Sequence, residues 1–415
     1  MDSTTESLEA LLRYGEQLLK AGSTAYRTRR AIDILACKMG IEALSLEIGF
    51  RSIAATAKRR GETVTLIREI VYPSVNSTKL MELHLLASAA PDGVHASDLI
   101  AGLKRIEGAV HRHSIAVTSV AVGLACGAFA FLNGGALTEI VTASIAGGLG
   151  QSLRARLMHR HLSPYGTYAI CGLVASTIYV ALANLLVHLG LDTETRHAAG
   201  FVSSVLFLVP GFPMISAVLD LLQHETTVGL SRLAYVLMLM LMAALGLSVV
   251  IDLADISIDA AVAPTMDLWT LTGARLLASF VGACGFAILF NGSLRNAICV
   301  GMLAILGNGL RLALARDYGL SLPFSTFAGA LVIGFFASFI RRRINEPRMS
   351  LTVAGSVMMV PGVYTFETLV HFSKGDILAG LETGFLTAFV VGAMALGLAV
   401  SRFLSEPASF RRPNP

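Results

Sequence analysis

Ten apolar segments, each long enough to cross a lipid bilayer, follow residue 113 and constrain the fold more than any other feature. A helix needs about 20 apolar residues to span the hydrocarbon core. Charged residues make up 14% of the chain, against about 25% in soluble domains. We therefore predict a polytopic α-helical membrane protein, with about ten spans at residues 114–132, 135–153, 167–189, 199–222, 232–251, 273–290, 296–314, 322–340, 349–371 and 377–402.

Residues 1–113 have the composition of a soluble domain, with 15 of the 32 Lys and Arg residues and 13 of the 28 Asp and Glu residues. Helical apolar spacing on both sides of Ala21 and Gly22 predicts two helices. Alternating residues over 42–70 then predict three strands, with turns at 49–52 and 60–61. Two more helices follow, one capped by Asn76 or Ser77 and one over about 96–111. We expect a small α+β domain.

Motifs of the common enzyme classes are missing from the sequence. It has no GxxxxGK[ST] phosphate loop, no HExxH and no G-x-S-x-G. The five cysteines show no metal-binding spacing. The cluster Arg27, Arg29 and Arg30 fits a solvated helix face better than a ligand site. We expect no enzyme activity, cofactor or metal, and the net charge of +4 is no argument for nucleic acid.

The distribution of basic residues predicts the orientation in the membrane. With the N-terminus inside, cytoplasmic segments after residue 113 hold twelve Lys and Arg residues, and outer loops hold three. Cytoplasmic loops are enriched in these residues. Both termini are therefore expected in the cytoplasm.

Two halves of five helices share sequence features. "GLACGAFAFLNGG" at 123–135 is similar to "GACGFAILFNGS" at 282–293, which aligns Asn133 with Asn291. A VPG tripeptide interrupts the fourth helix of each half. Because five is odd, the second half enters the membrane from the opposite side. These features predict two inverted repeats, at 114–251 and 273–403.

The two VPG breaks predict one binding site near the middle of the membrane. Proline removes a backbone donor and interrupts the helix, and the new helix end offers free N–H groups and a positive dipole to an anion. The residues expected to form the site come from both breaks and from the ends of two other helices: Pro210, Gly211, Phe212, Pro213, Pro361, Gly362, Tyr364, Thr365, Asn133 and Asn291. The two asparagines also suit C-terminal caps.

Ionisable residues inside membrane segments are costly and point to function. Glu367 is the deepest acid and the first candidate for proton coupling. Asp220 is the second candidate, although its position also fits the cytoplasmic interface. Glu139 fits an interfacial position. Arg311 could pair with an acid, bind a carboxylate or extend outward to the membrane surface, and the sequence favours the last alternative.

Three segments carry a resemblance to a known family. They are "GEQLLKAGSTAYRTRRAIDILACKMGI" at 15–41, "LVPGFPMISAVLDLL" at 208–222 and "VPGVYTFETLVHFSKGD" at 360–376. Over nearly its whole length the chain resembles the threonine/serine exporter family. Related bacterial systems split the halves into two subunits linked to succinate export. The resemblance implies export of threonine, serine or a dicarboxylate across the bacterial inner membrane, driven by the proton motive force.

Other functions remain open at this point. A channel, a ligand sensor or a membrane-embedded enzyme would each use a similar helical body. Counterflow separates a carrier, which trades substrate for substrate, from a channel. Small residues over 328–338 suit helix packing within one chain or between the chains of a homo-oligomer.

Overall fold

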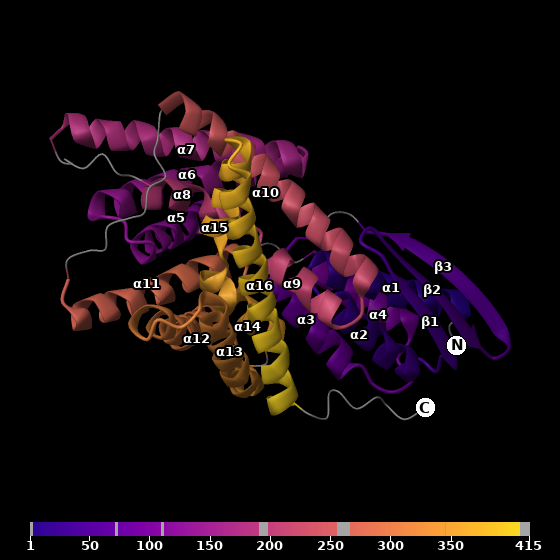
Figure 1. Ribbon diagram of the computed structural model, residues 1–415. Coiled ribbons are helices and arrows are strands. Elements are labelled where there is room, and N and C mark those ends of the chain that lie inside the picture. Colours follow the sequence, from indigo (N-terminus) through magenta and orange to yellow (C-terminus); the bar gives the residue numbers. More distant parts are fainter. Residues whose placement is uncertain are drawn as a thin grey trace.

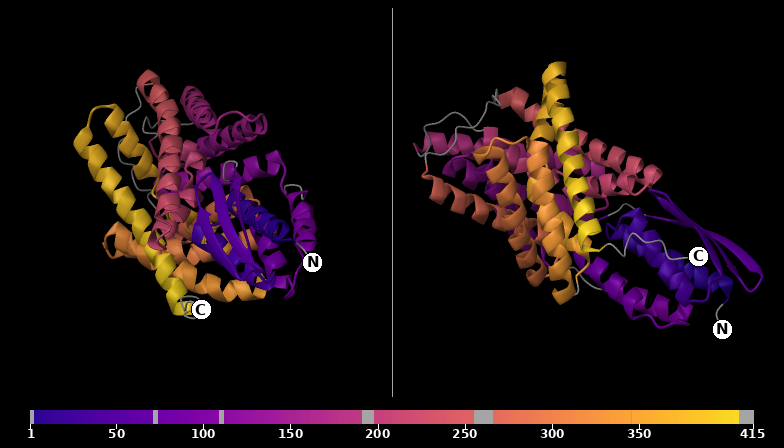
Figure 2. Two further views of the ribbon diagram at one scale, coloured as in Figure 1. Left: turned by 90° about the vertical axis from the view of Figure 1, so that its right-hand side faces the viewer. Right: turned by 60° about the horizontal axis from the view of Figure 1, so that its bottom comes forward.

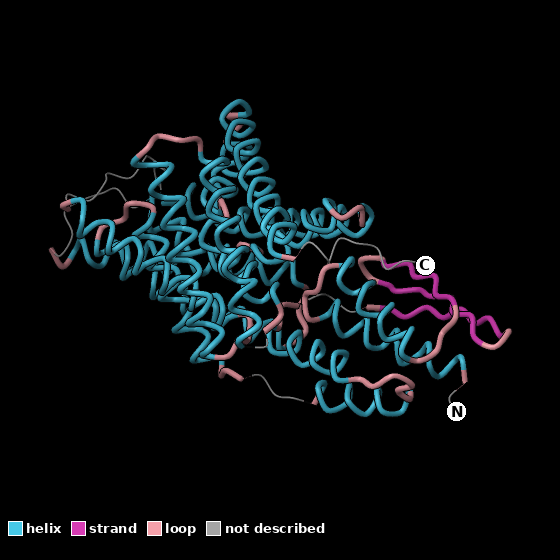
Figure 3. Tube along the Cα trace, turned by 90° about the horizontal axis from the view of Figure 1, so that it is seen from below, coloured by secondary structure: helices cyan, strands magenta, loops and turns pink. Residues whose placement is uncertain are grey.

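The computed structural model describes residues 3–70, 74–108, 112–190, 198–254, 266–344 and 346–406. It contains an N-terminal domain with a small sheet and a larger helical body beside it (Figure 1). The strands lie at the outer edge of the N-terminal domain, away from the body (Figure 3). The junction with the body includes helices of the domain and also the turn at residues 49–52, where the Phe50 and Tyr235 ring centroids lie 5.3 Å apart.

The N-terminal domain is built around its first helix, which packs on the sheet and on the other helices of the domain. The sheet is antiparallel with the order β1-β2-β3. The expected helices, strands and turns are confirmed, and Asn76 accepts a hydrogen bond from the Lys79 N–H as the predicted cap. The elements are α1 (Thr4–Lys20), α2 (Ala25–Lys38), β1 (Ala43–Ile48), β2 (Ser52–Arg59), β3 (Glu62–Glu69), α3 (Ser77–Ala89) and α4 (Ala96–Glu107).

The helical body follows the predicted segments one by one. Its first half contains α5 (Ile115–Leu132), α6 (Leu137–His159), α7 (Pro164–His188), α8 (Ala198–Val205), η1 (Leu206–Leu208), α9 (Gly211–Leu222) and α10 (Thr226–Ala254). Its second half contains α11 (Leu268–Leu289), α12 (Leu294–Leu312), η2 (Ala313–Asp317), α13 (Leu322–Ile344), α14 (Arg348–Ser356), η3 (Val357–Met359), α15 (Gly362–Ser373) and α16 (Ile377–Ser405).

Within the described residues, seven helices are long and apolar enough to cross a membrane, and nine if each of two bent helix pairs is one span. The bent pairs are α8–η1 with α9 and α14–η3 with α15, at angles of 65° and 54°. The remaining predicted span is α6, which carries charged residues such as Glu139, Arg154 and Arg156. The chain is therefore a multi-span membrane protein.

Corresponding helices make corresponding contacts in the two halves. α5 packs on α6 as α11 packs on α12, and α7 packs on α10 as α13 packs on α16. Across the halves, α9 contacts α16 and α10 contacts α15. α5 and α11, which also pack together, run in opposite directions, because α5 begins beside the N-terminal domain whereas α11 ends there, with the Ser77 N–H bonded to the Phe290 carbonyl (2.8 Å).

The ends of the body differ in their surroundings. We call the end that contacts the N-terminal domain the domain end and the opposite one the far end. α16 runs along the body and finishes beside the N-terminal domain (Figure 2), where the Arg402 guanidinium lies 5.6 Å from the Tyr26 ring centroid.

Glycines allow the long helices of each half to approach closely. A Cβ added to Gly172 on α7 would lie 2.5 Å from the Ala243 carbonyl oxygen on α10. In the second half, a Cβ on Gly397 of α16 would lie 2.5 Å from the Phe327 carbonyl oxygen on α13. Small residues at such positions let membrane helices pack backbone against backbone.

Replacing Gly172 by valine is expected to destabilise the body by about 1 to 3 kcal/mol, because the added methyl groups force α7 and α10 apart. Thermal unfolding of the purified protein in detergent measures this effect. Gly392→Val on α16 is the matched control, since a Cβ there meets nothing within 4 Å. Equal melting temperatures for the two variants would contradict the prediction.

Candidate functional site

The two VPG breaks have the same backbone geometry. Pro210 and Pro361 have φ and ψ of −78° and 59°, and of −78° and 55°. In each break the glycine N–H bonds to the carbonyl two residues earlier (2.8 Å), from Gly211 to Val209 and from Gly362 to Val360. Each proline is thus the centre of an inverse γ-turn between a 3₁₀ turn and a new α-helix.

The breaks also touch each other in a reciprocal way. A Cβ added to Gly211 would lie 3.1 Å from Val360, and one added to Gly362 would lie 3.1 Å from Val209. Each glycine therefore makes room for the valine of the other break. A small space of about 10 Å³ is lined by both breaks together with Phe129 and Phe286, and it has about the volume of one water molecule.

A cavity of about 590 Å³ opens beyond the second break, toward the far end. It lies between the two halves, because its walls come from the end of α5 and from α8 on one side and from α12 and α15 on the other. The polar residues among those that line it are Asn133, Asn308, Arg311, Arg316, Tyr364, Glu367 and His371. This volume is within the range of small-molecule sites.

Arg311 lies in this cavity and is oriented by its neighbours. Its Nη1 donates to the Asn308 Oδ1 (3.1 Å), and its Nε donates to the Thr326 hydroxyl (3.2 Å). Among the described residues, no aspartate or glutamate forms an ion pair with it. The sequence favoured an outward extension of this side chain, and that interpretation is wrong, because the guanidinium lines the cavity between the halves.

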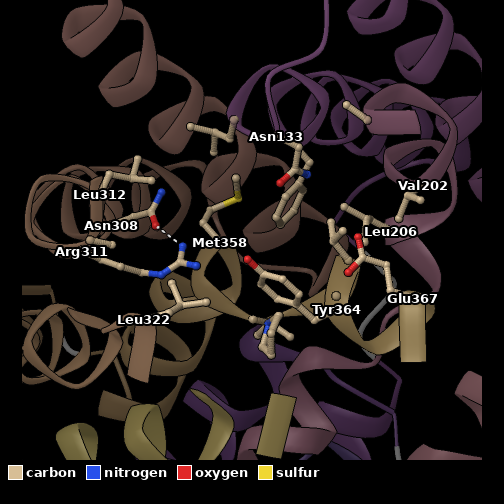
Figure 4. Close-up of a pocket in the computed structure, with 18 of the residues that line it drawn as sticks. Asn133, Val202, Leu206, Asn308, Arg311, Leu312, Leu322, Met358, Tyr364 and Glu367 are labelled. Atoms are coloured by element: carbon tan, nitrogen blue, oxygen red, sulfur yellow. Dashed lines mark hydrogen bonds between the residues drawn. The ribbon is translucent and has the colours of Figure 1, made fainter. Parts of the chain in front are cut away.

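The second broken helix supplies the opposite wall. Pro361, Gly362 and Tyr364 at the start of α15 line the cavity, and so does Glu367 one turn later. The leading N–H groups of a helix have no intrahelical acceptor, so this end of α15 presents donors and a positive dipole to the cavity. Figure 4 shows the Tyr364 hydroxyl directed toward Arg311, with Glu367 on the other side of the ring.

This arrangement suits a small anion beside a carboxyl group. Arg311, the side-chain amides of Asn133 and Asn308 and the start of α15 offer donors, and a guanidinium binds a carboxylate through two parallel hydrogen bonds. Among the lining residues that the structure describes, Glu367 is the one acid. Among the described residues, no group of three or more His, Cys, Asp or Glu is placed to hold a metal ion.

The structure brings part of the predicted site together. Five predicted residues line the far-end cavity: Asn133, Pro361, Gly362, Tyr364 and Glu367. Asn133 is also the C-cap of α5, so both of its expected roles are compatible. Thr365 is buried behind the cavity wall, with its hydroxyl bonded to the Pro361 carbonyl (2.8 Å).

The first break lies outside this cavity. Pro210, Gly211, Phe212 and Pro213 are not among its lining residues. Phe212 instead packs edge-to-face on Phe290 with ring centroids 5.4 Å apart. Phe212 also lies beside the N-terminal domain, because a Cβ added to Gly22 would lie 3.4 Å from its ring.

Asp220 lies at the junction with the N-terminal domain. It is fully buried, its Oδ1 accepts from the Ala25 N–H (2.8 Å) at the start of α2, and its Oδ2 lies 3.2 Å from the Arg232 Nη1. The Arg232 Nη2 in turn donates to the Ser23 carbonyl (3.2 Å). The sequence left a cytoplasmic interface position open for Asp220, and the structure places it at the junction between the body and the N-terminal domain.

Arg29 forms a second link across the same junction. Its guanidinium donates twice to Glu225, at 2.7 and 3.2 Å, and this hydrogen bonding raises the pKa of Arg29. The interpretation of residues 27–30 as a solvated helix face is therefore wrong for Arg29. The sequence could not show this partner, because Glu225 is far away along the chain.

Asn291 is at the junction too, and not in the far-end cavity. Its Nδ2 donates to the Asn76 Oδ1 (3.1 Å), its Oδ1 accepts from the Arg112 N–H (2.9 Å), and its carbonyl accepts from the Thr78 hydroxyl. Asn291 has a positive φ of 58°, which asparagine tolerates better than most residues. The two asparagines that align in sequence thus lie at opposite ends of the body.

Asn308 and Arg316 are cavity residues that sequence reasoning missed. The Arg316 Nη2 donates to the Leu132 carbonyl (2.9 Å) at the end of α5. An internal repeat could have indicated the Asn308–Arg311 pair, because "GNGLR" at 307–311 is similar to "GQSLR" at 150–154. That signal is short and was masked by the many glycines of these helices.

Two family models match the chain. Residues 9–254 match the model described as "Putative threonine/serine exporter", and residues 275–404 match "Threonine/Serine exporter, ThrE". The first match ends with α10 and the second begins within α11, so the two matches correspond to the two halves. No solved structure matches the chain.

Curated relatives carry two kinds of name. A "Probable threonine/serine exporter" of Mycobacterium tuberculosis is 25% identical over 97% of this chain and 77% of its own length. A "Probable succinate transporter subunit YjjP" of Klebsiella aerogenes is 27% identical over 55% of this chain and 86% of its own length. The protein of the same name from Escherichia coli is 26% identical, over 57% and 87%.

Proposed function

We propose that this chain, which belongs to the threonine/serine exporter family, is a secondary exporter of small metabolites that carry a carboxylate. The observation that carries the proposal is the far-end cavity, where Arg311 lies without an acidic partner among the described residues. The families matched are exporters and not a class of enzymes. Threonine and serine are the first substrates to test.

The proposal includes a membrane orientation and an inverted repeat. The excess of basic residues in segments at the domain end supports a cytoplasmic N-terminal domain, in the inner membrane of a bacterium. The matched helix pairs and the opposed directions of α5 and α11 support two five-helix repeats of inverted topology. The far-end cavity is then the outward opening, and movement of one half against the other gives alternating access.

In this proposal the substrate carboxylate binds the Arg311 guanidinium. Asn308 and Thr326 hold that side chain in place through hydrogen bonds, so little side-chain entropy is lost on binding. The start of α15 adds N–H donors on the facing wall. Asn133 and Tyr364 line the same cavity and offer hydrogen-bond partners to an amino group or hydroxyl of the substrate.

A dicarboxylate such as succinate is the second candidate substrate. Arg316 follows Arg311 by little more than one helical turn and also lines the cavity, so two guanidinium groups are available for two carboxylates. Two of the relatives named above are called succinate transporter subunits. Arg316→Gln is the discriminating variant, because it would weaken succinate export far more than threonine export.

The deciding assay uses purified protein in lipid vesicles loaded with labelled threonine, serine or succinate, with and without a pH gradient. Saturable efflux that follows the gradient, together with counterflow, supports a proton-coupled carrier. Linear efflux without counterflow would indicate a channel. Binding without flux would indicate a sensor.

We assign proton coupling to Glu367, since it is the acid that shares the cavity with Arg311 among the described lining residues. Glu367→Gln is expected to leave the protein folded and to abolish the acceleration of efflux by a pH gradient, because the amide cannot exchange a proton with the cavity. Counterflow, which needs no net proton movement, is expected to continue. Both rates are measured in the same vesicles.

Glu382→Gln is the matched control, because Glu382 is an exposed acid on the adjacent helix α16. It is expected to behave as the parent protein does. If efflux by Glu367→Gln still follows the pH gradient, another group couples transport. Asp220 is then the remaining sequence candidate, although its buried contacts assign it to the junction.

A further inference from the structure

A second cavity, of about 390 Å³, lies at the domain end of the body. Gln151, Ala155 and Met158 on α6 form one wall, and Leu289 and Asn291 at the end of α11 form another. Val75, between β3 and α3, and His113, between α4 and α5, also line it. The function proposed above assigned no role to this cavity.

The second cavity is built from the counterparts of the residues that form the first. Counted from the first residue of each helix, Gln151, Ala155 and Met158 on α6 hold the positions of three lining residues of the far-end cavity, which are Asn308, Leu312 and Ala315. Asn291 is the sequence counterpart of Asn133, which lines the far-end cavity. Each cavity therefore combines the first helix of one half with the second helix of the other.

Arg154 is the counterpart of Arg311 by the same count, and it makes the same local contact. The Arg154 Nη1 donates to the Gln151 Oε1 (3.3 Å), as the Arg311 Nη1 donates to the Asn308 Oδ1 (3.1 Å). Both are contacts between residues three apart on one helix, so the guanidinium stands beside an amide in each half. The amide lines the cavity in both cases.

The surroundings of the two arginines differ. Arg311 lines its cavity, whereas Arg154 donates to the Phe207 carbonyl (3.3 Å) and lies 5.5 Å from the Tyr168 ring centroid. Phe207 belongs to η1, the turn that precedes the first break. The Phe207 ring also fills the space beside Gly150, where a Cβ would lie 2.6 Å from it. Thus η1 holds Arg154 away from the domain-end cavity.

We propose that Gln151 and Arg154 form a second carboxylate-binding pair, which takes the exported substrate from the domain end. The proposal rests on the function proposed above and adds the site that loads the substrate. The domain-end pair binds the substrate carboxylate when η1 moves and frees Arg154. The far-end pair of Asn308 and Arg311 then binds the same carboxylate before the substrate is released. One substrate therefore meets equivalent pairs in turn as access alternates between the two ends.

The kinetic test measures the half-saturating substrate concentration separately from each side of the membrane. It uses oriented vesicles with labelled threonine and succinate. Arg154→Gln is expected to raise this concentration at least tenfold at the domain end and less than twofold at the far end. Arg311→Gln is expected to do the reverse. Arg156→Gln is the matched control, because Arg156 is exposed on the same helix. Equal changes on both sides, or none, would overturn the proposal.

A labelling test reports on the same site without transport. It uses Ala155→Cys in a Cys37→Ser background, since Cys37 is an exposed thiol of the native chain. A membrane-impermeant maleimide is expected to label this cysteine from the domain end only, and to label Leu312→Cys from the far end only. Threonine or succinate is expected to protect Ala155→Cys, and Arg154→Gln to remove the protection.

The two tests separate the proposals. Protection that depends on Arg154, in a protein that moves neither compound, supports the second pair and contradicts the exporter function. Transport with no protection, or with protection that Arg154→Gln leaves unchanged, supports the exporter and overturns the second pair. Labelling of Ala155→Cys from the far end would also overturn it.

Discussion

Arg311→Gln is expected to lower the transport efficiency, which is the maximal efflux rate divided by the half-saturating substrate concentration, about 10- to 100-fold while the protein stays folded. A hydrogen bond to a charged group contributes about 1.5 to 3 kcal/mol, and each 1.4 kcal/mol is a factor of about ten. The glutamine keeps some polar contact in the cavity and loses the cation. The efficiency is measured as efflux over a range of substrate concentrations.

Two further variants define what Arg311 contributes. Arg311→Lys keeps the charge without the two-pronged geometry, so its efficiency is expected to fall between those of the parent and of Arg311→Gln. Arg295→Gln is the matched control, because Arg295 lies on the same helix α12 and is exposed. If Arg311→Gln exports at the parent rate and with the parent half-saturating concentration, the substrate carboxylate does not bind at Arg311.

Asp220→Ala is expected to destabilise the protein by about 3 to 5 kcal/mol, the usual cost of removing one partner of a buried ion pair. Arg232 is only 5% exposed, so its charge would remain buried without its partner. The start of α2 would also lose the acceptor for the Ala25 N–H. Thermal unfolding in detergent and limited proteolysis of the N-terminal domain measure the effect.

A double variant separates the ion pair from other roles of Asp220. Asp220→Ala combined with Arg232→Leu removes both charges, and is expected to be more stable than Asp220→Ala alone, because no charge is left buried without a partner. Lys374→Leu, at an exposed position, controls for a general effect of removing a cation. Parent-like melting of Asp220→Ala would show that the junction does not depend on this pair.

The sequence by itself determined the helices and the breaks in them. Apolar segments of about 20 residues fold as helices in a membrane whatever surrounds them, because the backbone has no other donors and acceptors there. Pro210 and Pro361 interrupt their helices for a local reason, the missing N–H and the ring clash. In the N-terminal domain the alternation of β1 to β3, with Arg60 and Gly61 at a turn of positive φ, is equally local.

Tertiary structure alone decided which polar residues share a site. Asp220 and Glu367 each follow a VPG break, yet one lies at the junction with α2 and the other in the far-end cavity. Asn133 and Asn291 close aligned segments and lie at opposite ends of the body. Arg311 faces inward because α12 packs against α13 and α14. Helix rotation and packing between segments far apart in the chain set these neighbours, and apolar sequences carry little periodic signal for either.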